Sequence, residues 1–180
     1  DGKLSIEDRF LLGQSLEHYR HLVNQVEEIT AVIKQYVLER FEREYNLLIE
    51  LPGVSAIVAC VILSEIGPNV EAFQSQGNLA SWAGVCPGSY ESAGIKKSSH
   101  TTQGNKYLKS SLFQAGGIAG RSKDEAFHNL YARISGRSSK MKAIIACAHK
   151  MIRIIYKILS TGEHYDAKKA LGLRQQARAN

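Results

Sequence analysis

The amino-acid sequence predicts an all-α protein in which a long N-terminal helical arm leads into a compact helical domain. Its 180 residues suffice for one ordinary domain with such an arm. Over about the first 50 residues, apolar side chains recur at steps of three or four, the period of a helix. Farther along, capping residues and Gly or Pro stop signals bracket further apolar segments. Only residues 84–104 lack this period, and no apolar run reaches the roughly 18 residues of a membrane span.

Residues 1–50 form the predicted arm, which we expect to be coiled-coil-like. Between Ile6 and Leu48 there is no proline, and Gly13 is the only glycine. A helix of some 40 residues is about 60 Å long, too long for the rest of the chain to cover. We therefore expect a homo-oligomer, a dimer or tetramer, held through the arm. The alternative is a helical hairpin broken near Asn24. The apolar positions of the arm are Leu12, Leu16, Tyr19, Val23, Val26, Ile29, Ile33, Val37, Phe41, Tyr45 and Leu48.

Residues 51–165 form the predicted helical domain, and residues 166–180 a basic tail that frays. The first helix of the domain covers 56–66 and stops at Gly67-Pro68. Ser75 caps a short helix that carries Leu79, Ala80 and Trp82. Three longer helices are expected over 105–118, from Asp124 to Gly136, and over 140–159. In this pattern Tyr107 and Tyr131 fall on inward-facing stripes.

The charge of the chain is divided between its halves. Residues 1–90 carry 6 Lys/Arg and 12 Asp/Glu, a net of −6, whereas residues 91–180 carry 17 and 5, a net of +12. A basic half favours a nucleic-acid partner over a merely solvated surface. The three cysteines, Cys60, Cys86 and Cys147, lie far apart in apolar surroundings and are typical of reduced core thiols. The reduced thiols, together with the lack of an apolar signal segment at residues 1–10, favour a cytoplasmic location.

The turn Leu51-Pro-Gly-Val-Ser55 resembles the turn of a helix-hairpin-helix element. Gly53 allows a tight turn, and the free amides that follow it could hold a DNA phosphate. We therefore mark Gly53, Val54 and Ser55 as candidate DNA-binding residues. No Lys or Arg lies between Arg43 and Lys96, so a plain turn that packs two helices together is the alternative.

The stretch from Gly84 to Gly104 is a long hydroxyl-rich segment, which we expect to be a functional loop. Gly94 would let a DNA backbone come close. The segment with the helix start after it also carries cations and a glycine-asparagine pair, which could hold a phosphate: Lys96, Lys97, Gly104, Asn105, Lys106 and Lys109. From the residues alone, Ser89, Ser92, Ser98, Ser99, Thr101 and Thr102 are equal candidates for a nucleophile. A flexible polar loop is the alternative.

From Leu51 to about Tyr165 the sequence resembles the C-terminal domain of a family of insertion-sequence transposases. These are the DEDD-type, bridge-RNA-guided recombinases that use a catalytic serine. The resemblance rests on several short motifs that occur in the family's order. They are LPGV at 51–54, LASWAGVCP at 79–87, YESAG at 90–94, GNKYLK at 104–109, YARI at 131–134 and GEHY at 162–165.

The resemblance implies a nucleophile and partners. In the family, the serine that joins to DNA follows a proline by five residues, which from Pro87 selects Ser92. The resemblance also implies a guide RNA, a DNA substrate and location with the bacterial nucleoid. It further implies an N-terminal acidic domain that binds Mg²⁺. No such segment precedes residues 1–50, so we expect this chain to be a fragment with no cofactor of its own and no strand exchange alone.

Other interpretations remain. A non-catalytic module for nucleic-acid binding and dimerisation needs only the arm and the basic half. His100 could carry a proton. Tyr90, Tyr107 and Tyr131 invite a tyrosine-recombinase reading, but the arginine cluster of that chemistry is absent between Arg43 and Arg121. A basic stretch could follow a nucleic-acid backbone or be a solvated face: Arg121, Arg133, Arg137, Lys140 and Lys142.

Overall fold

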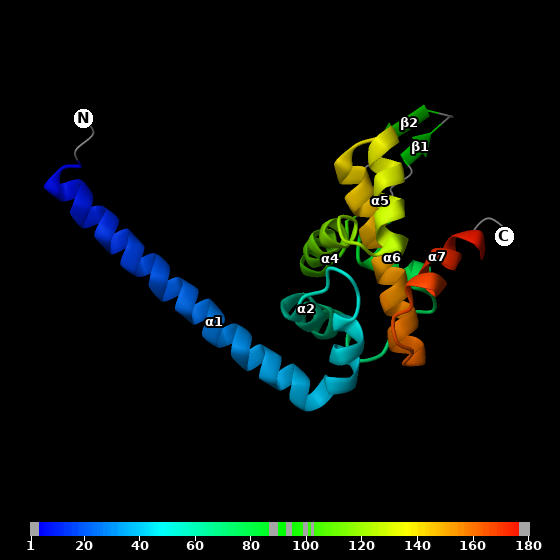
Figure 1. Ribbon diagram of the computed structural model, residues 1–180, viewed down its shortest axis with the longest axis horizontal. Coiled ribbons are helices and arrows are strands. Elements are labelled where there is room, and N and C mark those ends of the chain that lie inside the picture. The colour runs from blue at the N-terminus through cyan, green and yellow to red at the C-terminus, as the bar shows by residue number, and fades with distance from the viewer. Residues whose placement is uncertain (1–3, 87–89, 93–94, 99–100, 102, 177–180) are drawn as a thin grey trace. The chain divides into compact units, whose positions relative to one another are not determined.

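The computed structural model describes residues 4–86, 90–92, 95–98, 101 and 103–176. The prediction of an all-α fold with a long N-terminal helix is confirmed (Figure 1). A single short β-hairpin is the only sheet among the described residues. In chain order the elements are α1 (Ile6–Ile49), α2 (Ala56–Ile66), α3 (Gln76–Trp82), β1 (Tyr90–Ser92), β2 (Ile95–Ser98), α4 (Lys106–Ala119), α5 (Glu125–Arg137), α6 (Lys140–Thr161) and α7 (Ala167–Gln176).

The chain divides into two compact units, residues Asp1–Arg40 and Phe41–Asn180. The division falls inside α1, where Phe41 leaves the helical conformation with φ −137° and ψ 36°. The first unit is therefore the helix up to Arg40. The helical conformation continues through Asn24, so the alternative of a hairpin broken there is wrong. In the second unit, the last turns of α1 bring Tyr45, Leu47 and Leu48 into the core.

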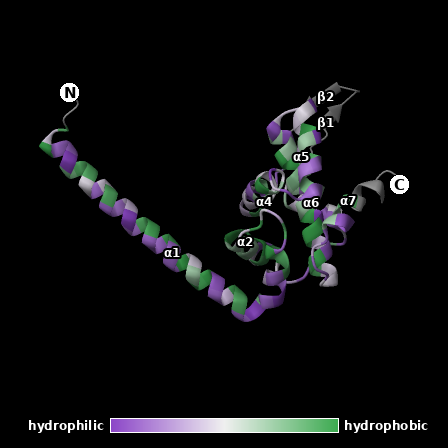
Figure 2. Cartoon of the chain, viewed as in Figure 1, coloured by the Kyte–Doolittle hydropathy of each residue, from purple (hydrophilic) through white to green (hydrophobic). Residues whose placement is uncertain are grey.

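The core of the second unit is built around α6, against which α3, α4 and α5 pack. Eight residues of α6 are buried, and they form a broad apolar stripe along the helix that faces the other helices. Figure 2 shows the resulting alternation of hydrophobic and hydrophilic residues along α6. The buried residues of α6 are Ala143, Cys147, Ala148, Met151, Ile152, Ile154, Ile155 and Ile158. Cys60 is buried as well, and Cys86 is half-buried.

Small residues bring α4 close to α6. A side chain at Gly116 would meet the backbone of Ala148, with its Cβ 2.8 Å from the amide nitrogen. Close backbone approach of this kind is possible only at glycine, and it extends the contact between the two helices. On the next turn of α4, Gly120 lies against the ring of Tyr131 from α5.

The predicted helix starts are confirmed. Ser55, Ser75, Asn105, Asp124 and Ser139 each accept a hydrogen bond from a first-turn amide of the helix that follows. These short polar side chains replace the missing intrahelical acceptors. Gly162 ends α6 in the left-handed conformation.

Three features differ from the sequence predictions. The segment expected to be a basic tail contains α7, and Ala170 on that helix is buried. The segment expected to be irregular holds β1 and β2. Tyr107 was placed on an inward stripe, which is wrong, because 61% of it is exposed. Tyr107 is the second residue of α4, in its first turn, and faces out of the core. No helix in the described part of the chain combines the length and apolarity of a membrane span.

The glycine at the α4–α6 contact gives a test of this packing. Gly116→Ala should lower the free energy of unfolding by about 1–3 kcal/mol, because the new methyl group overlaps the Ala148 backbone. Gly136→Ala is the matched control, since a Cβ there meets nothing within 4 Å. It should stabilise the protein by about 0.5–1 kcal/mol through helix propensity. Urea unfolding measures both, and equal effects would contradict the close crossing.

Candidate functional site

Residues 84–104 join α3 to α4, and we call this segment the finger. Its described part contains an antiparallel hairpin in which Ser92 is paired with Ile95 and Glu91 with Lys96. The register shifts between Tyr90 and Glu91, where Tyr90 is paired with Ser98. A shift of this kind bends a two-stranded ribbon and increases its twist.

The two ends of the finger meet at its base. The amide of Asn105 donates to the carbonyl of Trp82 at 3.1 Å. A Cβ on Gly104 would meet the amide nitrogen of Gly84, and it would lie 2.6 Å from both the Gly84 Cα and the Trp82 oxygen. Only a glycine therefore allows this closure. Val85, fully buried, adds a hydrogen bond from its amide to the Ala80 carbonyl at 3.1 Å.

Asn105 joins the finger to two helices. Its side-chain oxygen accepts from the amides of Tyr107 at 3.1 Å and Leu108 at 3.0 Å, which starts α4. Its side-chain nitrogen donates to the carboxylate of Glu65 near the end of α2. The sequence marked Asn105 as a site residue but carried no signal for Glu65, because the two are 40 residues apart.

The structure places the predicted site residues on two elements. Ser92, Lys96 and Lys97 lie on the hairpin, and Gly104, Asn105, Lys106 and Lys109 lie at the finger base and the start of α4. The proposed nucleophile Ser92 is the last residue of β1. Gly94 lies outside the described residues, as do Ser89, Ser99, His100 and Thr102. Among the other candidates for a nucleophile, Ser98 ends β2 and Thr101 is half-buried.

Two lysines in the first part of α4 lie close to aromatic rings. The Lys106 ammonium lies 4.8 Å from the centre of the exposed Tyr107 ring, and Lys109 lies 5.8 Å from that of Phe113. Two first-turn amides are already bound to the Asn105 oxygen. A phosphate here would therefore meet lysine side chains more than helix amides.

The turn at residues 51–55 contacts α4 near its C-terminal end, away from the base of the finger. A Cβ on Gly53, whose φ is +84°, would meet the Ala115 carbonyl and would lie 2.9 Å from the Ala119 amide. The Val54 amide donates to the Leu51 carbonyl at 3.0 Å, and Val54 is buried. The residues that Gly53 contacts follow Asn105 by ten and fourteen positions, roughly 15–20 Å along α4. The turn thus packs helices together, and DNA binding by Gly53, Val54 and Ser55 stays a prediction.

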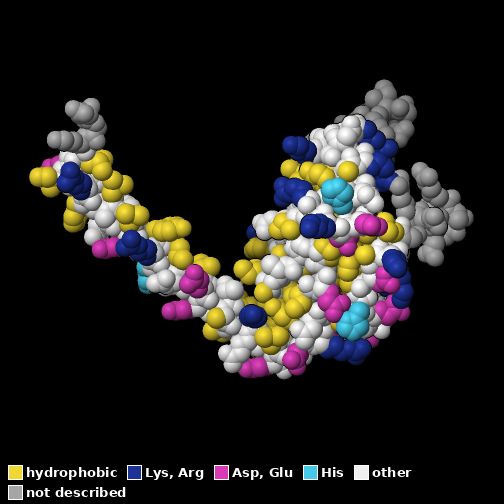
Figure 3. Space-filling model, in the orientation of Figure 1, with side chains coloured by type: hydrophobic (Ala, Val, Ile, Leu, Met, Phe, Trp, Pro, Cys, Tyr) yellow, Lys and Arg dark blue, Asp and Glu magenta, His cyan; other side chains and the backbone are white. Residues whose placement is uncertain are grey.

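Exposed basic residues continue at the junction of α5 and α6. Figure 3 shows Lys and Arg side chains gathered over the end of the second unit where these helices meet. Arg137 ends α5, and the exposed Lys140 and Lys142 begin α6. These three side chains form no ion pair with another described residue, and their positive charge favours an anionic partner.

A row of polar side chains on α6 supports α3, from which the finger begins. Arg153 Nε donates to Gln76 at 3.2 Å, and the Tyr156 hydroxyl donates to the Phe73 carbonyl at 3.2 Å. The ring of Phe73 in turn lies 5.3 Å from that of Trp82. Burial lowers the pKa of His149, and the neighbouring Arg153 guanidinium lowers it further. His149 is therefore neutral in the folded protein near pH 7.

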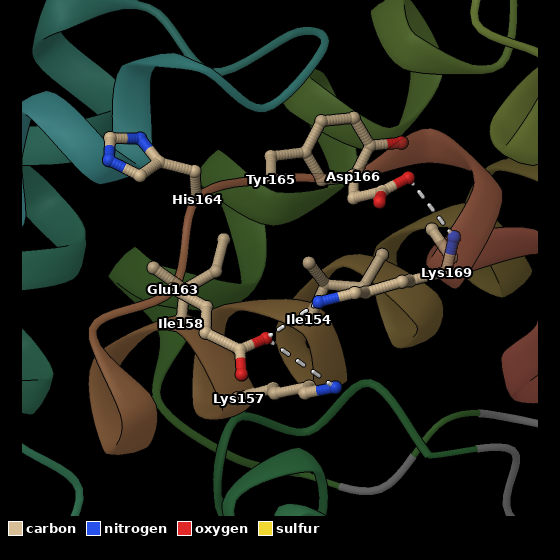
Figure 4. Close-up of a pocket in the computed structure, with 9 residues that line it drawn as sticks. Ile154, Lys157, Ile158, Glu163, His164, Tyr165, Asp166 and Lys169 are labelled. Atoms are coloured by element: carbon tan, nitrogen blue, oxygen red, sulfur yellow. Dashed lines mark hydrogen bonds and ion pairs between the residues drawn. The ribbon is translucent and has the colours of Figure 1, made fainter.

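A shallow pocket lies between α6, α7 and the segment that joins them (Figure 4). In the pocket, the Glu163 carboxylate forms ion pairs with the ammonium groups of Lys169 at 3.2 Å and Lys157 at 3.9 Å. Nearby, the Tyr165 hydroxyl donates to Asp124 at 2.9 Å, and burial together with this bond raises the pKa of Tyr165. The charges of Glu163, Lys157 and Lys169 in the pocket are thus paired with one another. No predicted site residue lines it, so we do not assign a function to it.

Part of the chain matches a known protein family. Residues 45–132 match the family described as Transposase IS116/IS110/IS902 family. The match covers just under half of the chain and shows that this part is similar to that transposase family. The matched range begins in the last turns of α1 and ends within α5, so it includes the turn at 51–55, the whole finger and α4.

Several curated proteins are similar over most of the chain. A pilin gene-inverting protein of Moraxella lacunata is 29% identical over 158 residues, which cover 84% of this chain and 48% of that protein. A putative transposase of Sinorhizobium fredii is 27% identical, covering 83% of this chain and 39% of its own length. A transposase for an insertion sequence element of Yersinia enterocolitica is 25% identical, covering 84% and 46%. The chain thus spans half or less of the length of these relatives.

Asn105 provides a test of the finger base. Asn105→Ala removes the cap of α4 and should cost about 1 kcal/mol of stability. Asn105→Asp keeps a capping oxygen but places a carboxylate against Glu65, so it should also destabilise the protein at neutral pH. Adding Glu65→Gln to Asn105→Asp should recover stability. Urea unfolding measures all three, and an Asn105→Asp variant as stable as the wild type would contradict the contact.

His149 provides a test by pH. Because its pKa is below the ordinary 6.5 in the folded state, its contribution to stability is complete above that value. Between 6.5 and the folded pKa, the unfolded chain binds a proton at His149 more readily than the folded protein does. The contribution is therefore lost as the pH falls through this range. Between about pH 7.5 and about pH 5, His149→Gln should therefore lose less Tm than the wild type. Calorimetry at each pH measures this, and parallel losses would disprove the burial of a neutral imidazole.

Proposed function

We propose that this chain supplies the serine-bearing part of a DNA recombinase and that Ser92 joins covalently to a DNA end. The observation that supports this most is the family match, which includes the whole finger with Ser92 at the end of β1. The name of the Moraxella lacunata relative says that it inverts a pilin gene, and inversion requires that DNA strands be cut and rejoined. The cationic residues of the finger and of α4 suit a phosphate substrate.

In the proposed reaction, the Ser92 Oγ attacks a DNA phosphorus atom. An Oγ–P bond forms while the P–O bond to the departing deoxyribose breaks, and that oxygen leaves as a hydroxyl. The seryl proton passes to a base. A hydroxyl of another DNA end then attacks the phosphoserine, which forms a new phosphodiester and releases Ser92. The energy of the original linkage is thereby kept for rejoining.

Four lysines are assigned to binding in this proposal. Lys96 and Lys97 on β2, with Lys106 and Lys109 at the start of α4, would offset the charge of the attacked phosphate. Asn105 and Gly104 would act by holding the base of the finger closed. The basic residues at the α5–α6 junction would bind the DNA backbone farther from the reacting bond.

A metal is assigned to the other part of the recombinase. The described residues of this chain contain no group of three or more His, Cys, Asp or Glu that could hold a metal ion. Mg²⁺ in the acidic domain that the family resemblance implies would polarise the phosphate. A guide RNA that selects the DNA is likewise part of the proposal. Alone, this chain would then bind DNA without exchanging strands.

Substitution of Ser92 tests the proposal in the full-length protein that contains this chain, supplied with guide RNA and labelled DNA. The wild type should form a protein–DNA adduct that resists denaturant and maps by mass spectrometry to the peptide with Ser92. Ser92→Ala should abolish the adduct and strand exchange, a loss of at least about a thousandfold, while DNA affinity changes little.

Ser98→Ala is the matched control, because it removes a second hydroxyl from the same hairpin. It should keep the adduct. Strand exchange by Ser92→Ala would exclude Ser92 as the nucleophile. Salt-sensitive DNA binding with no adduct in the wild type would favour the other candidate, a non-catalytic binding module that uses the basic half of the chain.

A further inference from the structure

The helix of the first unit carries a long apolar stripe, most of which is exposed in the described chain, although Val37 at its end is buried. Tyr19 is 64% exposed, Val26 63% and Ile33 47%. Figure 3 shows hydrophobic side chains at intervals along α1. A solvated helix gains no stability from such a stripe, because its stabilisation comes from burial. The stripe therefore indicates a partner surface.

The stripe follows a heptad repeat without interruption. Between residues 12 and 37, the a and d positions alternate at steps of four and three, and Thr30 is the only polar residue among them. Arg9 and Arg40 occupy the next such positions on either side and end the stripe. We call these residues the seam: Leu12, Leu16, Tyr19, Val23, Val26, Thr30, Ile33 and Val37. The exposed Leu22, Ile29 and Tyr36, at g positions, widen it on one side.

We propose that two copies of this chain pair through α1 as an antiparallel coiled coil centred between Asn24 and Gln25. In an antiparallel pair, a positions meet the partner's d positions. With this centre, Leu16 meets the partner's Ile33, and Val23 meets the partner's Val26. Thr30 meets the partner's Tyr19. The six seam residues from Leu16 to Ile33 are thus all matched.

The flanking positions favour this register. The e positions of an antiparallel pair face one another, and here Arg20 meets the partner's Glu27 while Glu27 meets the partner's Arg20. On the opposite flank, Leu22 meets the partner's Ile29, which extends the apolar contact. Charge complementarity at such positions selects orientation and register.

Neighbouring arrangements are disfavoured by charge. Sliding the pair by a heptad in one direction places Arg20 against the partner's Arg20. Sliding it in the other direction places Glu27 against the partner's Glu27. A parallel, in-register pair would place Glu27 against the partner's Leu22 and would form no opposite-charge pair between e and g. Only the central antiparallel register combines a matched seam with attractive flanks.

Charge reversal tests the register in the intact chain by sedimentation equilibrium. Arg20→Glu and Glu27→Arg should each weaken self-association roughly tenfold or more, because each turns both ion pairs into repulsions. The double variant Arg20→Glu/Glu27→Arg should regain the wild-type Kd. Glu28→Arg is the matched control, because its f position faces away from the seam and should leave the Kd unchanged.

Cysteine cross-linking tests the orientation. Under mild oxidation, a mixture of Leu16→Cys and Ile33→Cys chains should form a mixed disulfide, and neither chain alone should do so, with the wild type as background for the native cysteines. In the proposed pair the two Leu16 positions lie about 25 Å apart, beyond the reach of a disulfide. Homodimers of either variant would overturn the orientation. A monomeric wild type, or single reversals without effect, would overturn the self-association. Neither result bears on the role of Ser92.

Discussion

The backbone contact between Gly104 and Gly84 is the constraint on which the candidate site depends. It brings the two ends of a segment of about twenty residues together, so the hairpin with Ser92 leaves the domain from a closed base. The contact tolerates no side chain at residue 104, since even a methyl group would overlap the Gly84 backbone. With the bond from Asn105 to Trp82, it couples the finger directly to both α3 and α4.

The base in turn rests on α6. Arg153 and Tyr156 hold the start of α3 and the residues before it, while Gly116 lets α4 lie close against Ala148. The two helices that carry the finger are thus fixed by the same buried helix. This arrangement suits a site that must present a nucleophile and cations to a phosphate, because sites positioned by rigid elements lose little geometry to thermal motion. Substitutions in α6 should therefore affect the finger without touching it.

The two units differ in where their apolar residues lie. The second unit buries its apolar residues internally, around α6, and carries the basic residues on its surface. The first unit leaves most of its seam exposed and carries Arg20 and Glu27 on one flank of it. A recombinase must hold two DNA sites at once, so a chain with a self-complementary helix joined to a serine-bearing domain would suit that task. The interruption at Phe41 marks the boundary between the two units within one helix.

The sequence by itself determined the helices, because their signals are local. Apolar steps of three and four marked the stripes, and Ser55, Ser75, Asn105 and Asp124 marked the starts. It also selected Ser92, through resemblance. The tertiary structure alone decided what these residues touch: Gly53 against α4, Asn105 against Glu65, and Tyr107 turned outward. Contacts between residues far apart in the chain leave no periodic or capping pattern, since they depend on how the helices pack.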